Sequence, residues 1–327
     1  MKRVIVGMST CGLSAGAQQT YDAIAGLLES SPGAFELSRT GCIGMCYREP
    51  LVEIRDGDDR VIYGDVTPEL AGEIVSRHVL GGEVLGDHVA YSIAADGTTG
   101  GDEKVFHDLQ HRIVLRNCGV IDPESIEEYE ATGGYAAARK ALLEMTPEEI
   151  VREVSEAGLR GRGGAGFPTG LKWSFAAKNA ADRKYVVCNA DEGDPGAFMD
   201  RSVLEGDPHA VLEGMIVCGR AIGASYGYVY CRAEYPMAIH RLTIALDAAR
   251  EKGYLGTNIL GSGFDFDIKI KQGAGAFVCG EETALFASIE GERGMPRIRP
   301  PFPAEKGLWR KPTNNNNVET YANVPWI

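Results

Sequence analysis

The sequence predicts an α/β protein made of two domains, and two observations carry this prediction. Residues 1–82 hold short apolar segments and helical segments in the order β-α-β-β-β-α, which gives a small sheet covered by helices. Residues 106–327 hold apolar strands that run into glycine turns and then helices, as in α/β folds that bind ligands at strand ends. Residues 83–105 are rich in glycine and acidic residues and are expected to be a linker.

The elements expected in residues 1–82 follow from periodicity and from turn residues. Asp56-Gly57 between two apolar runs predicts a hairpin, and Thr67-Pro68-Glu69 predicts the start of a helix that stops at Gly81-Gly82. This order is compatible with a thioredoxin-like fold. The other expected elements are a helix over 15–28 and strands over 2–7, 35–39, 51–54 and 60–63.

Composition and charge exclude several classes of protein. A chain of 327 residues with 44% hydrophobic residues can bury an ample core. The formal charge of −13 argues against nucleic acid as a partner, because phosphate backbones select basic faces. No apolar run approaches the roughly 18–20 residues of a membrane span, and the start lacks the features of a signal peptide, so a cytoplasmic chain is expected. Eight cysteines are too few for a disulfide scaffold.

The most informative stretch runs from Gly158 to Trp173 and contains six glycines. Its backbone N–H groups can approach an anion closely, as in phosphate cradles. Two arginines and Lys172 add positive charge, while Phe167 and Trp173 offer flat faces to a ring. A phosphate together with a ring indicates a nucleotide or a flavin, and the alternative is a long surface turn.

This stretch is not an ordinary Rossmann site. Gly161, Gly163 and Gly166 match the dinucleotide fingerprint, but that fingerprint requires an apolar strand directly before it. Here Thr146-Pro147-Glu148-Glu149 predicts a capped helix that ends at Gly158. The glycines therefore follow a helix.

Further strands and helices are expected after the glycine stretch. An apolar strand over 184–190 runs into an acidic glycine turn, where side chains at a strand end can hold ligand hydroxyls. A strictly alternating strand over 264–271 leads into a second glycine turn. A strand over 228–232 and helices over 236–252 and 284–289 complete the set. His107 and His111 stand four apart, but nothing nearby completes a metal site, and surface histidines are favoured.

Four segments resemble one protein family. They are GLRGRGGAGFPTGLKW from Gly158, NADEGDPGAF from Asn189, GAGAFVCGEETAL from Gly273 and KPTNNNNVETYANVP from Lys311. Together they make residues 106–327 similar to the NADH-binding FMN flavoprotein subunit of respiratory complex I. Relatives of that subunit occur in NAD-linked hydrogenases, formate dehydrogenases and bifurcating complexes.

The resemblance implies a non-Rossmann α/β domain that oxidises NADH or NADPH by hydride transfer to FMN. Electrons would then pass singly to iron–sulfur centres in other subunits of a larger redox complex. Because the cofactor carries the chemistry, no side chain is nominated as catalytic. The alternative is a non-catalytic scaffold or docking subunit with a degenerate flavin fold. Neither the terminal acceptor nor the choice between NADH and NADPH follows from the sequence.

The resemblance also implies the residues of the site. Two positions depart from the family, where glutamate is usual at Asp194 and tyrosine at Phe277. The residues expected to bind FMN are Gly161, Arg162, Gly163, Gly164, Lys172, Asn189, Asp191, Gly280, Glu281, Asn316, Asn317 and Thr320. The residues expected to bind NADH are Phe167, Phe175, Asp194, Phe277, Glu282, Arg299 and Phe302.

Residues 1–82 resemble the thioredoxin-like [2Fe–2S] ferredoxin domain through Cys11, Cys42 and Cys46. A cluster normally needs four ligands, and Gly16 stands where the family has another cysteine. A cluster-free docking domain with leftover thiols is the alternative. Full-length members of the family continue through a ubiquitin-like domain to a [4Fe–4S] domain, whereas this sequence ends at Ile327 and contains no CxxCxxC run. A [4Fe–4S] cluster is therefore not expected within it.

Overall fold

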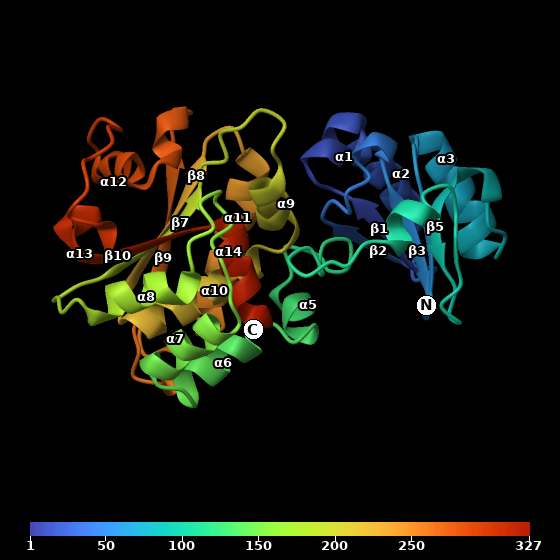
Figure 1. Cartoon of the computed structure of the whole chain (residues 1–327). Helices are drawn as coiled ribbons and strands as arrows, with labels where there is room; N and C mark the ends of the chain where they lie inside the picture. The colour runs from blue at the N-terminus through green and yellow to red at the C-terminus, as the bar shows by residue number, and fades with distance from the viewer. The chain divides into compact units, whose positions relative to one another are not determined.

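The computed structural model describes residues 1–327, which form two compact units, Met1–Pro123 and Glu124–Ile327 (Figure 1). The division falls after Pro123, later in the chain than the start expected at residue 106. No helix in either unit is both long and apolar enough to cross a membrane.

The N-terminal unit is built on a six-stranded sheet in the order β2-β1-β3-β4-β5-β6. Strands β1 and β2 are parallel, and each later pairing is antiparallel. The order of the first four strands confirms the expected thioredoxin-like arrangement. The strands are β1 (Arg3–Gly7), β2 (Glu36–Thr40), β3 (Val52–Asp56), β4 (Asp59–Tyr63), β5 (Val89–Ile93) and β6 (Thr99–Gly100).

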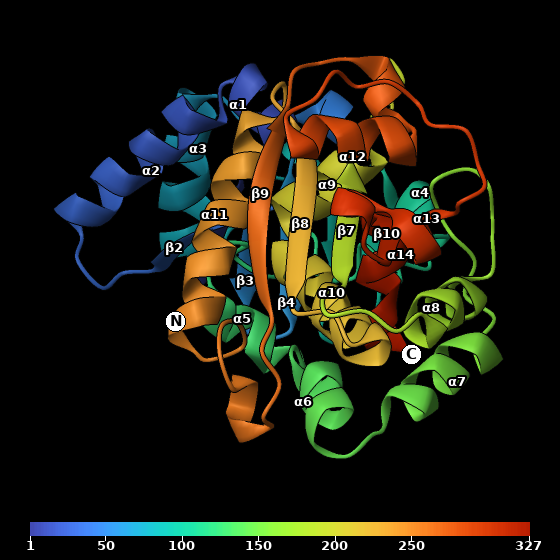
Figure 2. The ribbon, with the colours of Figure 1, turned by 90° about the vertical axis from the view of Figure 1, so that its left-hand side faces the viewer.

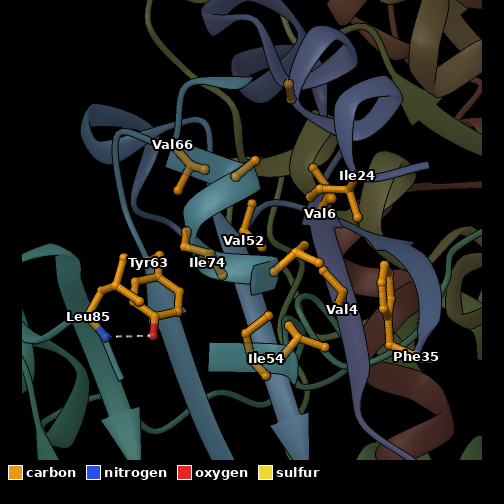
Figure 3. Close-up of a cluster of buried hydrophobic side chains, with 14 of the residues drawn as sticks. Val4, Val6, Ile24, Phe35, Val52, Ile54, Tyr63, Val66, Ile74 and Leu85 are labelled. Carbon is orange, nitrogen blue, oxygen red and sulfur yellow. Dashed lines mark hydrogen bonds between the residues drawn. The ribbon is translucent and has the colours of Figure 1, made fainter. Parts of the chain in front are cut away.

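Helices cover this sheet and close its core. Val4, Val52 and Ile54 point from β1 and β3 toward Ile24 of α2 and Ile74, and all five are 1% exposed or less (Figure 3). The backbone N–H of Leu85 donates to the Tyr63 hydroxyl at 3.3 Å, which ties the following segment to this core. The helices are α1 (Thr10–Ala15), α2 (Ala17–Ser30), α3 (Pro68–Glu73), which continues as a wider helical turn over Ile74–Leu80, and α4 (Lys104–Asp108).

The region expected to be a linker carries two strands of this sheet. Strand β5 pairs with β4, with Ile62 opposite Tyr91, and β6 pairs with β5. Residues 83–105 are rich in glycine and acidic residues, so the sequence did not predict β5, a strand of only five residues. Helix α4 ends at Asp108, so His107 and His111 do not share a helix.

The C-terminal unit contains a parallel sheet in the order β10-β7-β8-β9 (Figure 2). The chain passes from β7 to β8 to β9 in one direction, and then returns to place β10 on the other side of β7. The strand order therefore reverses between β7 and β10, which is the position where open α/β sheets bind ligands. The strands are β7 (Tyr185–Ala190), β8 (Tyr226–Arg232), β9 (Asp267–Gly273) and β10 (Thr313–Asn317).

Helices cover both faces of the parallel sheet. Helix α12 packs Leu285 and Phe286 against Tyr185 and Tyr230 on one face. Helix α10 lies on the other face and is buried throughout except at Arg220. The helices are α5 (Ile126–Ala131), α6 (Ala136–Leu143), α7 (Pro147–Glu156), α8 (Thr169–Lys178), α9 (Met199–Gly206), α10 (Pro208–Ile222), α11 (Pro236–Glu251), α12 (Glu282–Glu290), α13 (Pro303–Lys306) and α14 (Val318–Asn323).

The helix predicted before the glycine stretch is confirmed as α7. Thr146 and Glu149 form a complete capping box at its start, and Gly158 follows its end with φ +68°. Helices α9 and α10 had no counterpart in the sequence prediction, although Asp207 caps α10 by accepting a hydrogen bond from Ala210 N at 3.2 Å. Short 3₁₀ turns lie at Cys46–Arg48, Gly86–His88, Ile259–Gly261, Phe277–Gly280, Leu308–Arg310 and Val324–Trp326.

Candidate functional site

A cavity of about 850 Å³ opens at the carboxyl ends of β7 and β10, where the strand order reverses. This volume is typical of cofactor sites. Fourteen of the nineteen residues expected to bind FMN or NADH line it. They are Gly161, Gly163, Phe167, Lys172, Phe175, Asn189, Gly280, Glu281, Glu282, Arg299, Phe302, Asn316, Asn317 and Thr320.

The glycine loop, residues 160–168, forms one wall of the cavity. Gly161 N donates to Phe167 O at 2.9 Å, and Arg160 and Pro168 form an isolated β-bridge, so the loop is closed on itself. Gly164 and Gly166 take φ values of +103° and +61°, which L side chains adopt only with strain. The loop thus exposes backbone where other residues would place a Cβ.

The glycine loop is attached to the end of β10 and to α14. Arg162 N donates to the Thr320 hydroxyl at 2.9 Å. A Cβ at Gly163 would lie 3.3 Å from the Cβ of Asn317. Loop, strand end and helix therefore form one continuous surface.

The asparagines of β10 supply polar groups to the cavity. Trp173 Nε1 donates to Asn316 Oδ1 at 3.0 Å, and Lys172 Nζ donates to Asn315 O at 2.6 Å. Asn315 lines the cavity with a buried Oδ1 that has no hydrogen-bond partner. A buried acceptor of this kind is costly unless a ligand or water satisfies it.

Asn317 is held by the protein itself. Its Nδ2 donates to both carboxyl oxygens of Asp200, and its Oδ1 accepts from Glu319 N at 2.9 Å. Its amide is thus fully used in capping α14 and binding Asp200. Asn317 shapes the wall beside Gly163 instead of presenting a free amide.

At the end of β7, Asn189 connects two loops. Its Nδ2 donates to Gly280 O at 2.9 Å, and its Oδ1 accepts from Asp191 N at 3.1 Å. Asp191 itself does not line the cavity. Burial raises the pKa of Asp191 to about 6, and the nearby Arg232 lowers it only in part.

The adjacent carboxylates Glu281 and Glu282 share Arg299, whose Nη2 lies 3.5 Å from Glu281 Oε1, but their other partners differ. Glu281 accepts hydrogen bonds from the backbone N–H groups of Thr283 and Ala284 at 2.9 and 3.0 Å, so it caps α12. Glu282 lies between two cations, with Oε1 2.7 Å from Arg299 and Oε2 3.3 Å from Lys172. The second carboxylate thus fixes the two positive side chains of the cavity.

Three phenylalanines give the cavity its flat apolar faces. Phe167, Phe175 and Phe302 are 44%, 43% and 55% exposed, although apolar side chains of this size are normally buried. The Phe167 and Phe175 ring centroids lie 6.4 Å apart with the planes tilted by 47°. These faces are available to a planar ligand.

Five expected residues lie outside the lining. They are Arg162, Gly164, Asp191, Asp194 and Phe277. Phe277 is 70% exposed, and its ring leaves no room for a side chain at Gly193.

Eight lining residues were missed by the sequence prediction, namely Ala165, Gly166, Lys178, Asn179, Pro303, Ala304, Glu305 and Asn315. Lys178 could have been predicted, because its spacing from Lys172 and Phe175 places all three residues on one face of α8.

The three cysteines expected as cluster ligands are not gathered into a metal site. No three His, Cys, Asp or Glu side chains in the chain come together in an arrangement that could hold a metal ion. Cys42 and Cys46 do pair, with sulfurs 3.4 Å apart across a turn at Gly44, whose φ is +94°. The contact with Cys46, together with burial, raises the pKa of the Cys42 thiol.

The chain is similar to known redox proteins. It is 66% identical over 218 residues to an NADP-reducing hydrogenase subunit, HndC, of Solidesulfovibrio fructosivorans, covering 67% of this chain and 44% of that protein. It is 58% identical over 224 residues to an NADH-quinone oxidoreductase subunit of Aquifex aeolicus, covering 68% of this chain and 52% of that protein. The crystal structure of an air-oxidised NAD⁺-reducing [NiFe]-hydrogenase matches with 30% identity and a TM-score of 0.54, covering all of this chain and 52% of the hydrogenase chain.

The chain spans about half the length of the curated relatives that it matches. The profile of the Nuo51 FMN-binding domain matches residues 154–326, which is more than half of the chain and includes every residue that lines the cavity. The chain therefore belongs to the Nuo51 FMN-binding domain family.

Proposed function

We propose that the C-terminal unit binds FMN in the cavity between β7 and β10 and oxidises NADH or NADPH there. The observation that carries this proposal is the convergence of a glycine loop, the positive side chains of Lys172 and Arg299, and exposed phenylalanines on one cavity at the reversal of strand order. The chemistry that FMN supplies when bound is acceptance of a hydride and release of electrons one at a time.

The residues around the loop would hold the phosphate and the polar parts of the cofactor. The N–H groups of Gly163 and Gly164 would contact the phosphate, with the Arg162 and Lys172 side chains adding positive charge, while the N–H groups of Gly161 and Arg162 hold the loop in shape. The remaining FMN contacts are proposed for Asn189, Asp191, Gly280, Glu281, Asn316, Asn317 and Thr320.

The aromatic end of the cavity would hold the dinucleotide. Phe167, Phe175 and Phe302 offer stacking faces, while Glu282 and Arg299 offer a carboxylate and a guanidinium to ribose and phosphate groups. Asp194 and Phe277 are proposed to contact the nicotinamide side. Because the redox step belongs to the cofactor, these side chains bind and orient without acting as acid or base.

We further propose that electrons leave toward iron–sulfur centres in other subunits of a redox complex. The names of the relatives, which describe components of a hydrogenase and of a quinone oxidoreductase, support this. A cytoplasmic location is part of the proposal, because none of the eight cysteines forms a disulfide, as expected in a reducing compartment. The N-terminal unit would dock partner subunits, and Cys11, Cys42 and Cys46, which do not gather into a metal site, would remain thiols.

The test is the absorbance of the purified chain with and without added FMN, followed by anaerobic titration with NADH and NADPH. We expect a stoichiometric flavin spectrum, bleaching by the dinucleotide and reduction of one-electron dyes. We expect no reduction of a physiological acceptor by the chain alone. Absence of flavin binding would favour the scaffold alternative.

A further inference from the structure

Asp200 is a buried carboxyl group that lies behind the wall of the cavity. It is 3% exposed and lies in the first turn of α9. Both of its carboxyl oxygens accept hydrogen bonds from Asn317 Nδ2, at 2.9 and 2.7 Å. Asn317 lines the cavity, and its Cβ lies 3.3 Å from where a Cβ at Gly163 would be. The Asn317 side chain therefore connects Asp200 to the glycine loop.

Acidic groups surround Asp200 on two sides. Glu192, which follows β7, accepts hydrogen bonds from Asp200 N at 3.1 Å and from Arg201 N at 3.2 Å. Glu319 lies on α14, and its carboxyl is half-buried near Arg162. Burial, followed by repulsion from Glu192, raises the pKa of Asp200 to about 8. The other titratable groups around this region are Tyr235, Arg201, Glu205 and the buried thiols of Cys188 and Cys231.

We propose that binding of a phosphate-bearing ligand at the glycine loop is coupled to protonation of Asp200, so that the chain takes up a proton when the ligand binds. The inference rests on the proposed function, because it assumes that FMN places its phosphate in this loop. A new negative charge beside Asn317 disfavours the charged form of Asp200. The proton comes from solvent and stays on a carboxyl oxygen, which leaves the other oxygen to accept from Asn317.

The coupling makes phosphate binding at the glycine loop depend on pH, which the glycines alone would not do. A carboxylate fixed behind a phosphate site would oppose the ligand, whereas a neutral carboxyl keeps the Asn317 contact without the charge. For a one-unit rise in the pKa of Asp200 on binding, affinity for FMN should fall roughly fivefold between pH 7 and pH 9, and it approaches the factor of ten that one pKa unit represents over a wider range. The FMN phosphate is already doubly charged over this range.

The experiment is isothermal titration calorimetry of the flavin-free full chain with FMN at pH 8 in buffers of different ionisation enthalpy. We expect uptake of roughly half a proton per FMN, because a group with a pKa near 8 is about half ionised there. Asp200→Asn should abolish the uptake and make FMN affinity independent of pH. Asp247→Asn, which changes an exposed carboxylate on α11, should retain the uptake.

Riboflavin provides a test that does not depend on a variant that folds. It has the same ring and side chain but no phosphate, so we expect it to bind wild-type chain without proton uptake. FMN binding without uptake, or equal uptake with riboflavin or with folded Asp200→Asn, would overturn the coupling while leaving the proposed function intact. Failure to bind FMN at all would overturn both.

Discussion

The two units of this chain use similar parts but only one of them builds a cavity of cofactor size at a strand-order reversal. Each packs helices on a small sheet, and each buries a tyrosine–histidine pair, Tyr63 with His78 and Tyr135 with His209, at 2.8 Å. The N-terminal sheet is mixed and most of its strands are joined by antiparallel pairing. The C-terminal sheet is parallel and reverses its strand order between β7 and β10. A reversal of strand order between parallel strands, as at β7 and β10, therefore determines where a ligand can enter, more than α/β composition does.

The largest expected effect is the loss of FMN affinity in the C-terminal unit when a side chain is added at Gly163. Gly163→Val should lower FMN affinity by roughly a hundredfold or more, because a branched side chain blocks backbone approach and crowds Asn317. Gly163 has no positive φ, so the fold should be retained. Flavin content and a thermal melt measure both points. Gly26→Val, at an open helical position in the N-terminal unit, is the matched control and should keep full flavin.

Acid should destabilise both units through their buried histidines, and the C-terminal unit more strongly. Burial lowers the pKa of His209 from 6.5 to about 4 and also lowers that of His78. The unfolded chain therefore binds the proton first as pH falls. His209 should cost about 3 kcal/mol of stability between pH 6.5 and 4, with full stability above that window.

Urea unfolding at several pH values measures this effect. His209→Phe should flatten the pH dependence, even though it lowers stability by leaving the Tyr135 hydroxyl without its partner. An unchanged slope in a folded His209→Phe protein would show that other groups carry the acid sensitivity.

A smaller effect should separate the two adjacent carboxylates of the cavity. Glu282→Gln is expected to weaken NADH binding by about one to two decades while FMN binds normally, since a charge-assisted hydrogen bond is worth roughly 1.5–3 kcal/mol. Glu281→Ala should mainly lower stability, by about 1 kcal/mol, through loss of the α12 cap. NADH titration of the flavin signal beside a thermal melt distinguishes them. Loss of stability without loss of affinity in Glu282→Gln would assign it to the helix start alone.

The smallest expected effect concerns the cysteine pair of the N-terminal unit. Cys46 is exposed, so Cys46→Ser should change the free energy of unfolding by no more than about 0.5 kcal/mol and leave flavin content unchanged. Iron analysis of both proteins accompanies the melt. The opposite outcome is iron in the wild-type protein that disappears in Cys46→Ser, together with a loss of several kcal/mol of stability. That result would identify a cluster site and show that both units bind a redox cofactor.

Local sequence signals determined much of this molecule. The capping box at Thr146 and Glu149, the turn at Asp56-Gly57 and the alternation before Gly273 each depend on neighbouring residues, and each predicted its element. The glycine loop was also recognisable, because its function depends on missing side chains in a single segment. Half of the lining residues were predicted from the four segments that resemble the flavoprotein family.

Long-range packing decided the rest. The strand β5 within residues 83–105 exists because β4 offers it an edge, and no local pattern reports that edge. Helix α10 is buried on all sides except at Arg220 and includes His209 and Glu213, so its burial does not follow a single apolar stripe. Glu281 and Glu282 are neighbours in the sequence, and Asn317 stands in a run of asparagines. Only the tertiary structure shows that Glu281 caps a helix while Glu282 lies between two cations. It also turns the Asn317 amide toward Asp200, because hydrogen-bond partners far apart in the chain compete for each polar atom.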